Sequence, residues 1–195
     1  MMQIWNHFSV VLASNSPRRK ELLSLMGVPF TVDVSNADER VEGEPDARVY
    51  EISQRKALAV AASHPDAIIL AADTLVYDGS VLGKPRDEKE AFEMLSRLGG
   101  RWHEVYTGVS VYTPRNGRMD TRVEKTRVHF CPMTEEQIAA YIASGEPMDK
   151  AGAYAVQGTG GMYVDRLEGS YSNVVGLPMH TVRRMLEDAA KALQE

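Results

Sequence analysis

Short apolar runs typical of strands alternate with helix-periodic segments along almost all of this 195-residue chain, and this alternation limits its possible folds more than any other feature. Strand-like runs lie at residues 8–13, 30–34, 67–72, 105–112, 121–130 and 162–167, with a hairpin over 75–82. Helical patterns lie at residues 18–26, 47–63, 87–98, 134–144 and 178–193. Elements of both kinds, mixed along the chain, predict the α/β class with a mixed β-sheet flanked by helices.

Local signals indicate where two of the helices begin or end. Ser16 suits the N-cap of the first helix, and Gly27 suits the glycine position after its last turn. Thr134 and Gln137 have the spacing of a capping box.

Two polar pairs indicate where strands end. We expect the strand at 67–72 to end at Asp73-Thr74, because an apolar run gives way there to polar residues. Asp78-Gly79 is a strong signal for a two-residue hairpin turn, and it predicts that the following hairpin folds around this pair.

Charge balance and cysteine content restrict the partners and the compartment. A formal net charge of -5 argues against general nucleic-acid binding, because no broad basic field would offset the phosphates. Cys131 cannot form an intrachain disulfide, which fits a reducing compartment, and we interpret it as a small buried hydrophobe rather than a reactive thiol. No signal-peptide pattern and no apolar run near ~20 residues is present. We therefore expect a cytoplasmic protein without a membrane or nucleic-acid partner.

A strand followed by the start of a helix carries the first candidate site. Ser14, Ser16, Arg18 and Arg19 crowd the place where unpaired amide groups and the helix dipole favour an anion. Arginine forks match phosphate oxygens in bidentate geometry. The segment predicts a phosphate site, and the alternative is an ordinary capped helix with two solvated arginines.

Carboxylates and lysines supply further candidates. Asp73 follows a buried strand, where a carboxylate can hold a divalent metal or deprotonate water; the alternative is a turn-forming aspartate. Glu39 lies in an acidic loop that could bind Mg²⁺ jointly with phosphates, or could simply be solvated. Lys56 and Lys84 are of interest only if they converge with the arginines, since a single lysine is usually a solvated surface charge.

A glycine-rich run near the C-terminus, residues 144–158, ends in a neutral amide that suits a nucleobase. Glycines permit close backbone approach to a ligand, and Gln157 can both donate to and accept from the edge of a base. The alternative interpretation of this run is a set of structural turns.

Taken together, these segments resemble the Maf family. The matching motifs, in family order, are Ser14-Asn15-Ser16-Pro17-Arg18-Arg19, Ala72-Asp73-Thr74, Gly83-Lys84-Pro85, Thr107-Gly108-Val109, Asp149-Lys150-Ala151-Gly152-Ala153-Tyr154, Gln157-Gly158 and Val174-Val175-Gly176-Leu177-Pro178. Each motif alone is weak, but seven in order over nearly the whole chain make chance agreement improbable.

The resemblance implies a fold and an activity. The fold would be a two-lobed α/β structure like that of the inosine triphosphate pyrophosphatases, with residues 1–195 forming one domain around a central cleft. The activity would be hydrolysis of a nucleoside triphosphate between its α and β phosphates, aided by Mg²⁺ or Mn²⁺. A homodimer is also implied, with the strand pair at 105–130 as one candidate surface.

The same resemblance assigns roles to single residues. Asp73 matches the catalytic proton acceptor, and Arg18, Thr74 and Gln157 match the positions associated with substrate choice. This combination resembles the branch that acts on dTTP and UTP. The branch that acts on 7-methylguanosine triphosphate tends to carry Trp, Gln and Glu there, and it remains the alternative enzyme. A nucleotide-binding regulator of septum formation is the alternative outside enzymes.

These roles combine into one mechanistic hypothesis. The triphosphate lies across the helix start, and its oxygens are held by the cations Arg18, Arg19, Lys56 and Lys84. Glu39 and Asp73 hold the metal or orient the water that attacks the α phosphorus, and pyrophosphate leaves.

Overall fold

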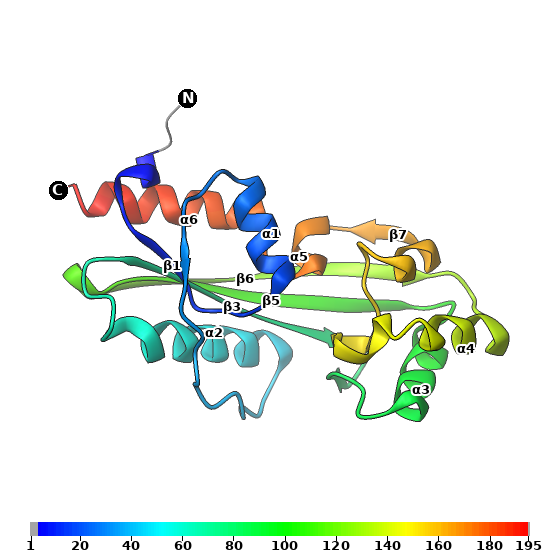
Figure 1. The fold of residues 1–195 in the computed structure, drawn as a ribbon. Coiled ribbons are helices and arrows are strands. Elements are labelled where there is room, and N and C mark those ends of the chain that lie inside the picture. Colours follow the sequence, from blue (N-terminus) through cyan, green and yellow to red (C-terminus); the bar gives the residue numbers. More distant parts are fainter. Residues whose placement is uncertain (1–3, 195) are drawn as a thin grey trace. The chain divides into compact units, whose positions relative to one another are not determined.

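The computed structural model describes residues 4–194 (Figure 1). The α-helices are α1 (Pro17–Leu25), α2 (Pro45–Ala61), α3 (Glu88–Leu98), α4 (Glu135–Ala143), α5 (Tyr171–Val175) and α6 (Met179–Ala192). Short 3-10 helices are η1 (Ile4–His7), η2 (Pro114–Asn116), η3 (Glu146–Asp149), η4 (Ala151–Ala153) and η5 (Thr159–Tyr163). The strands are β1 (Val10–Leu12), β2 (Thr31–Val32), β3 (Ile68–Tyr77), β4 (Val81–Leu82), β5 (Trp102–Thr113), β6 (Arg118–Phe130) and β7 (Val164–Glu168).

The strands form a mixed sheet. Their order is β2-β1-β3-β5-β6-β7, and β4 pairs with β3 beside this path. β1 is parallel to both β2 and β3, whereas β4 is antiparallel to β3 and β7 is antiparallel to β6. The expected α/β class with a mixed sheet and accompanying helices is therefore confirmed.

The described residues divide into two compact units. Unit 1 contains residues 4–73, 107–124 and 176–194, and unit 2 contains residues 74–106 and 125–175. The strands β3, β5 and β6 each contribute residues to both units. Each unit has a buried apolar core of its own.

The core of unit 1 lies between α2 and the strands of that unit. It contains Val11, Ala13, Ala57, Val60, Ala67, Ile69 and Ala71. Small side chains in this set let the helix approach the strands closely. At Gly108 of β5 the approach is extreme, because a Cβ atom there would lie 2.1 Å from the Val49 carbonyl oxygen of α2. Only glycine fits that position without a backbone shift.

The core of unit 2 is richer in aromatic and long aliphatic side chains. The helices α3 and α4 pack against each other, and both contribute to this core. His103, Phe130 and Tyr154 meet edge to face, with ring centroids 4.7 to 5.3 Å apart. The helix expected at residues 87–98 is α3, which is amphipathic and buries Ala91, Met94, Leu95 and Leu98.

Several predicted helix ends are confirmed in detail. Ser16 is the N-cap of α1, and its hydroxyl accepts the Arg19 backbone N–H. Gly27 follows the helix with a positive φ of 69°. Thr134 and Gln137 form the reciprocal capping box at the start of α4.

The prediction that a strand ends at Asp73-Thr74 is wrong. β3 runs through this pair to Tyr77, because buried Leu75 and Val76 continue the apolar sequence and Val76 pairs with Leu82 of β4. The expected two-residue turn at Asp78-Gly79 is also wrong, since Tyr77 pairs with Val81 and leaves three residues in the loop. Asp73 therefore lies within a long strand rather than at its tip.

Within residues 4–194, no helix is both long and apolar enough to cross a membrane.

Candidate active site

The start of α1 carries the first part of the site in unit 1. Ser14 lies just after β1 and is buried, and its hydroxyl oxygen accepts the Ser16 backbone N–H at 3.2 Å. Ser16 in turn caps the helix. The two serines thus shape the strand-to-helix connection, which the sequence predicted as a phosphate site.

Arg19 is fixed to two parts of unit 1. Its Nε donates to the Gly176 carbonyl oxygen at 2.9 Å, and its Nη1 donates to the Ser14 hydroxyl at 3.2 Å. Burial lowers the pKa of Arg19 and the nearby Arg18 charge lowers it further, while the charges of Asp73 and Glu39 act in the opposite direction. The Arg19 guanidinium therefore lies within electrostatic reach of Arg18 and of both predicted carboxylates.

Lys56 joins these two carboxylates. Its ammonium lies 2.8 Å from an Asp73 carboxylate oxygen and 3.0 Å from a Glu39 carboxylate oxygen. The side chains of Lys56 and Asp73 are only 10% and 14% exposed, whereas that of Glu39 is 58% exposed. The carboxylate–lysine cluster (Glu39, Lys56 and Asp73) is thus closed on the protein side and open at Glu39.

The acidic loop that carries Glu39 is held by an arginine that sequence reasoning missed. Arg55 of α2 donates from one guanidinium nitrogen to the carbonyl oxygens of Asp38 and Arg40, at 3.2 and 3.4 Å. These residues flank Glu39 on both sides, so Arg55 anchors the loop to the helix that carries Lys56. Its position beside Lys56 in the sequence was the only available signal.

A chain of hydroxyl groups holds α2 in place. The Ser53 hydroxyl lies 2.9 Å from that of Ser110 in β5, and the Ser110 hydroxyl lies 2.9 Å from that of Thr121 in β6. Ser53 and Ser110 are fully buried. Because Ser53 precedes Lys56 by one helical turn, this chain also fixes the height of Lys56 above the sheet.

The remaining predicted residues belong to unit 2. Thr74 is half-buried in β3, whereas Lys84 and Gln157 are exposed. The Gly83 carbonyl accepts the Gly152 N–H at 3.1 Å, so two of the sequence motifs meet within this unit. Gln157 lies in a turn closed by the Gly158 N–H and the Ala155 carbonyl at 3.2 Å.

The donor atoms in unit 1 fit a divalent cation only partly. Glu39 and Asp73 offer hard carboxylate oxygens, but within residues 4–194 no group of three or more His, Cys, Asp or Glu side chains could hold a metal. Mg²⁺ is commonly bound by one or two carboxylates together with substrate phosphates and water. The carboxylate–lysine cluster therefore fits a cation that arrives with a phosphate ligand.

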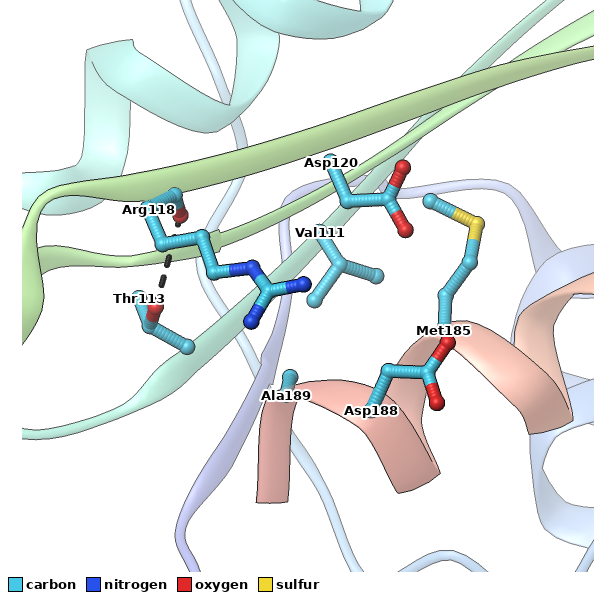
Figure 2. Close-up of a pocket in the computed structure, with 7 residues that line it drawn as sticks. All are labelled: Val111, Thr113, Arg118, Asp120, Met185, Asp188 and Ala189. Carbon is cyan, nitrogen blue, oxygen red and sulfur yellow. Dashed lines mark hydrogen bonds between the residues drawn. The ribbon is translucent and has the colours of Figure 1, made fainter. Parts of the chain in front are cut away.

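A separate hollow in unit 1 contains none of the predicted site residues. Figure 2 shows its lining side chains, which are Val111, Thr113, Arg118, Asp120, Met185, Asp188 and Ala189. Arg122 lies nearby and donates to both Asp120 and Asp188, at 2.8 and 3.3 Å. Since its two acidic groups already share this arginine, the hollow does not compete with the carboxylate–lysine cluster as a candidate active site.

Fold and cluster together define a class: a mixed α/β protein that gathers arginines of a helix start, a lysine and two carboxylates within one unit. A family model described as Maf-like protein matches residues 9–189. The chain belongs to this Maf family.

Relatives match most of the chain, and one solved structure shares its fold. A protein from Bacillus cereus named dTTP/UTP pyrophosphatase is 48% identical over 181 residues, which covers 91% of this chain and 94% of the relative. A protein of the same name from Bacillus velezensis is 44% identical, covering 92% and 95%. The fold is shared with a HAM1 protein from Coxiella burnetii, with a TM-score of 0.52, 11% identity, and coverage of 93% and 99%.

Proposed function

We propose that this chain is a nucleoside triphosphate pyrophosphatase that hydrolyses dTTP and UTP to the monophosphate and pyrophosphate. The observation that carries the proposal is the carboxylate–lysine cluster within electrostatic reach of Arg19. Relatives named dTTP/UTP pyrophosphatase at 48% identity support the choice of reaction and substrate.

Binding of the triphosphate is assigned to the start of α1. Ser14, Ser16, Arg18 and Arg19 supply hydroxyl groups, a helix N-terminus and two guanidinium groups for the phosphate oxygens. Lys84 is a further proposed catalytic residue, because it belongs to the matching motif Gly83-Lys84-Pro85. The Arg19 side chain is already held by Ser14 and Gly176, so little conformational entropy is lost when it meets an anion.

The bond that breaks joins the α phosphorus to the oxygen bridging to the β phosphorus. Asp73 accepts a proton from water as the water oxygen bonds to the α phosphorus, and pyrophosphate leaves with the bridging oxygen. Lys56 holds the Asp73 carboxylate in one orientation at 2.8 Å, and its charge offsets the negative charge that gathers at the phosphates.

A divalent cation, Mg²⁺ or Mn²⁺, would be held by Glu39 and Asp73 with the phosphates, and when bound it supplies electrostatic stabilisation of the leaving pyrophosphate. Glu39 suits this role because its side chain is the exposed member of the carboxylate–lysine cluster.

Selection of a pyrimidine is assigned to Arg18, Thr74 and Gln157. The exposed amide of Gln157 can donate to and accept from a base edge, and a wrong base would leave these groups unmatched. We further propose a cytoplasmic homodimer, in line with the single cysteine and the resemblance to the family.

A panel of triphosphates tests the proposal. Pyrophosphate release is measured for dTTP, UTP, dATP, GTP and 7-methylguanosine triphosphate, with Mg²⁺ and again with a chelator. We expect dTTP and UTP to have the highest kcat/KM and the chelator to abolish turnover. A purine triphosphate at the head of the ranking would reject the substrate assignment, and no release from any triphosphate would reject the enzyme.

A further inference from the structure

The turn that displays Gln157 is held from both sides by one pair of side chains in unit 2. We name residues 155–160 the Gln157 turn. Before Gln157, the Ala155 backbone N–H donates to the Tyr141 hydroxyl at 3.2 Å. After it, the backbone N–H groups of Thr159 and Gly160 each donate to the Glu146 carboxylate at 3.0 Å.

Tyr141 and Glu146 are themselves joined. The Tyr141 hydroxyl donates to a Glu146 carboxylate oxygen at 2.7 Å, the oxygen that also accepts the Gly160 N–H. The phenol therefore accepts on one side of the Gln157 turn and donates to the carboxylate that accepts on the other side. Together the two side chains close a continuous hydrogen-bonded ring around the turn.

The ionisation of both groups suits this arrangement. Burial raises the pKa of the Glu146 carboxyl, but the Tyr141 hydroxyl, the Gly160 and Thr159 amides and the Lys150 charge together hold its pKa below the usual range. Burial, and then the Glu146 carboxylate, raise the pKa of Tyr141, which keeps its hydroxyl protonated as a donor. Hydrogen bonds to an ionised acceptor are stronger than neutral ones.

The sequence of the turn is adapted to the carboxylate. A Cβ atom at Gly158 would lie 2.4 Å from one Glu146 carboxylate oxygen and 2.6 Å from the other. Any larger residue at 158 would displace Glu146. The glycine directly after Gln157 thus lets the carboxylate reach the two amides that follow.

We propose that Glu146 and Tyr141 are positioning residues for substrate selection, which hold the Gln157 turn so that the Gln157 amide is preorganised for the base. The inference rests on the proposed function, since it assigns base recognition to Gln157. Neither side chain need touch the substrate. Their effect passes through the backbone of residues 155–160 to a single exposed side chain.

The kinetic test uses Glu146→Gln, which keeps the shape of the side chain but removes its charge and half of its acceptor atoms. We expect KM for dTTP to rise about tenfold while kcat changes less than about threefold. The reason is that the lost charge-assisted hydrogen bonds orient the Gln157 amide, which contacts the base, and not the groups that contact the reacting atoms. Preference for dTTP over dATP should fall by about the same factor. Glu93→Gln, at an exposed position of α3, carries the same charge change and should leave all three values unchanged.

A double-mutant cycle tests the route through Gln157. Gln157→Ala should lower the preference for dTTP by itself, and adding Glu146→Gln should change that preference by less than about twofold, because residues that act as one unit are not additive. Multiplicative effects of the two substitutions would overturn the inference. So would unchanged selectivity in either single variant.

Hydrogen exchange supplies a readout that does not depend on turnover. Peptide amides of residues 155–160 should exchange faster in Glu146→Gln than in Glu93→Gln, and equal rates would overturn the inference. Should Glu146→Gln fail to fold, Tyr141→Phe removes one donor and one acceptor of the ring and should shift the same quantities in the same direction. A wild-type chain that cleaves no pyrimidine triphosphate rejects the proposed function itself, whereas an active wild type with unaltered Glu146→Gln rejects only the positioning role.

Discussion

The ammonium of Lys56 is nearly buried and contacts two carboxylates, and the proposed hydrolysis depends mainly on this arrangement. Each carboxylate is held within 3.0 Å of the same nitrogen, so the orientation of Asp73 depends on Lys56 as much as on its own strand. A proton acceptor must be oriented before its basicity matters. In the proposed mechanism the cluster therefore combines a base, Asp73, with the cation that aligns it, Lys56.

Asp73→Asn tests the base. The amide keeps the size of the side chain but cannot accept a proton from water, so kcat should fall about 10²- to 10⁴-fold with a smaller change in KM. Steady-state release of pyrophosphate from dTTP measures both constants. Asp66→Asn makes the same change at an exposed position of unit 1 and should leave them unaltered. Near-full turnover in Asp73→Asn would remove Asp73 from the proposed mechanism.

His103 is a buried residue of unit 2 with an unusual titration. Burial lowers its pKa from about 6.5 to about 4, and its Nε2 lies 2.8 Å from the Tyr154 hydroxyl while its Nδ1 is buried without a partner in the described residues. Because the unfolded chain takes up this proton more readily, stability is full above about pH 6.5 and is lost as the pH falls toward 4. The expected loss is about 3 kcal/mol.

Thermal or urea unfolding between pH 4 and 7 measures how steeply the free energy of unfolding changes with pH. His103→Gln retains a partner for the Tyr154 hydroxyl but does not titrate, so its stability should vary less with pH over this window. His180→Gln, at an exposed position of α6, should keep the wild-type slope. An equal slope in His103→Gln and wild type would contradict the assignment.

At the scale of elements, α2 is positioned by its contact with β5. Gly108 permits the approach of the Val49 carbonyl, and two residues further along the same strand Ser110 bonds to Ser53 of the helix. Alternate residues of a strand face the same side, so both contacts come from one face of β5. The position of α2, which carries Lys56, is thus fixed by the close contact at Gly108 and by the buried hydroxyl of Ser110.

Gly108→Ala should therefore disturb the packing of α2 against β5. A methyl group 2.1 Å from a backbone carbonyl oxygen forces the helix away, and we expect a loss of stability of about 2 kcal/mol or more together with reduced turnover. Denaturant unfolding and pyrophosphate release measure the two effects. Gly83→Ala, where an added Cβ meets nothing within 4 Å, is the matched control for stability. A fully stable Gly108→Ala would show that the contact is looser than described.

Much of this framework could be predicted from the sequence, because helix ends and amphipathic stripes depend on neighbouring residues. The Ser16 cap and the Thr134–Gln137 capping box are of this kind. The continuation of β3 through Asp73 was missed, because the polar pair Asp73-Thr74 interrupts the apolar run that Leu75 and Val76 resume. The five-residue helix α5 is too short to show a period.

The candidate site, like the fold, could be predicted from the sequence only in part. Motif residues such as Arg19, Lys56 and Asp73 could be singled out in advance, because charged groups in a strand or helix start imply chemistry. The supporting contacts could not, since Arg55 acts on backbone carbonyls of a loop and Glu146 acts on amides 13 and 14 residues away. Such partners are brought together only when the chain folds, and they produce no periodic pattern in the sequence.

At the scale of the whole molecule, neither unit is a continuous piece of chain. Unit 1 needs residues 4–73, 107–124 and 176–194, and unit 2 is made from the two stretches between them. Arg19 and the carboxylate–lysine cluster come from the first segment of unit 1, while the Gly176 carbonyl that accepts from Arg19 comes from its last segment.

The division of the chain into interleaved segments has a consequence during synthesis on the ribosome. Unit 2 has all of its residues once position 175 has emerged, whereas unit 1 still lacks α6 and the acceptor for Arg19. Nascent chains arrested shortly after that point should resist protease over unit 2 while the N-terminal segment stays accessible. Arg19, the proposed phosphate ligand, would then reach its final geometry only after residue 176 has emerged, so a product truncated before that residue would lack this arrangement.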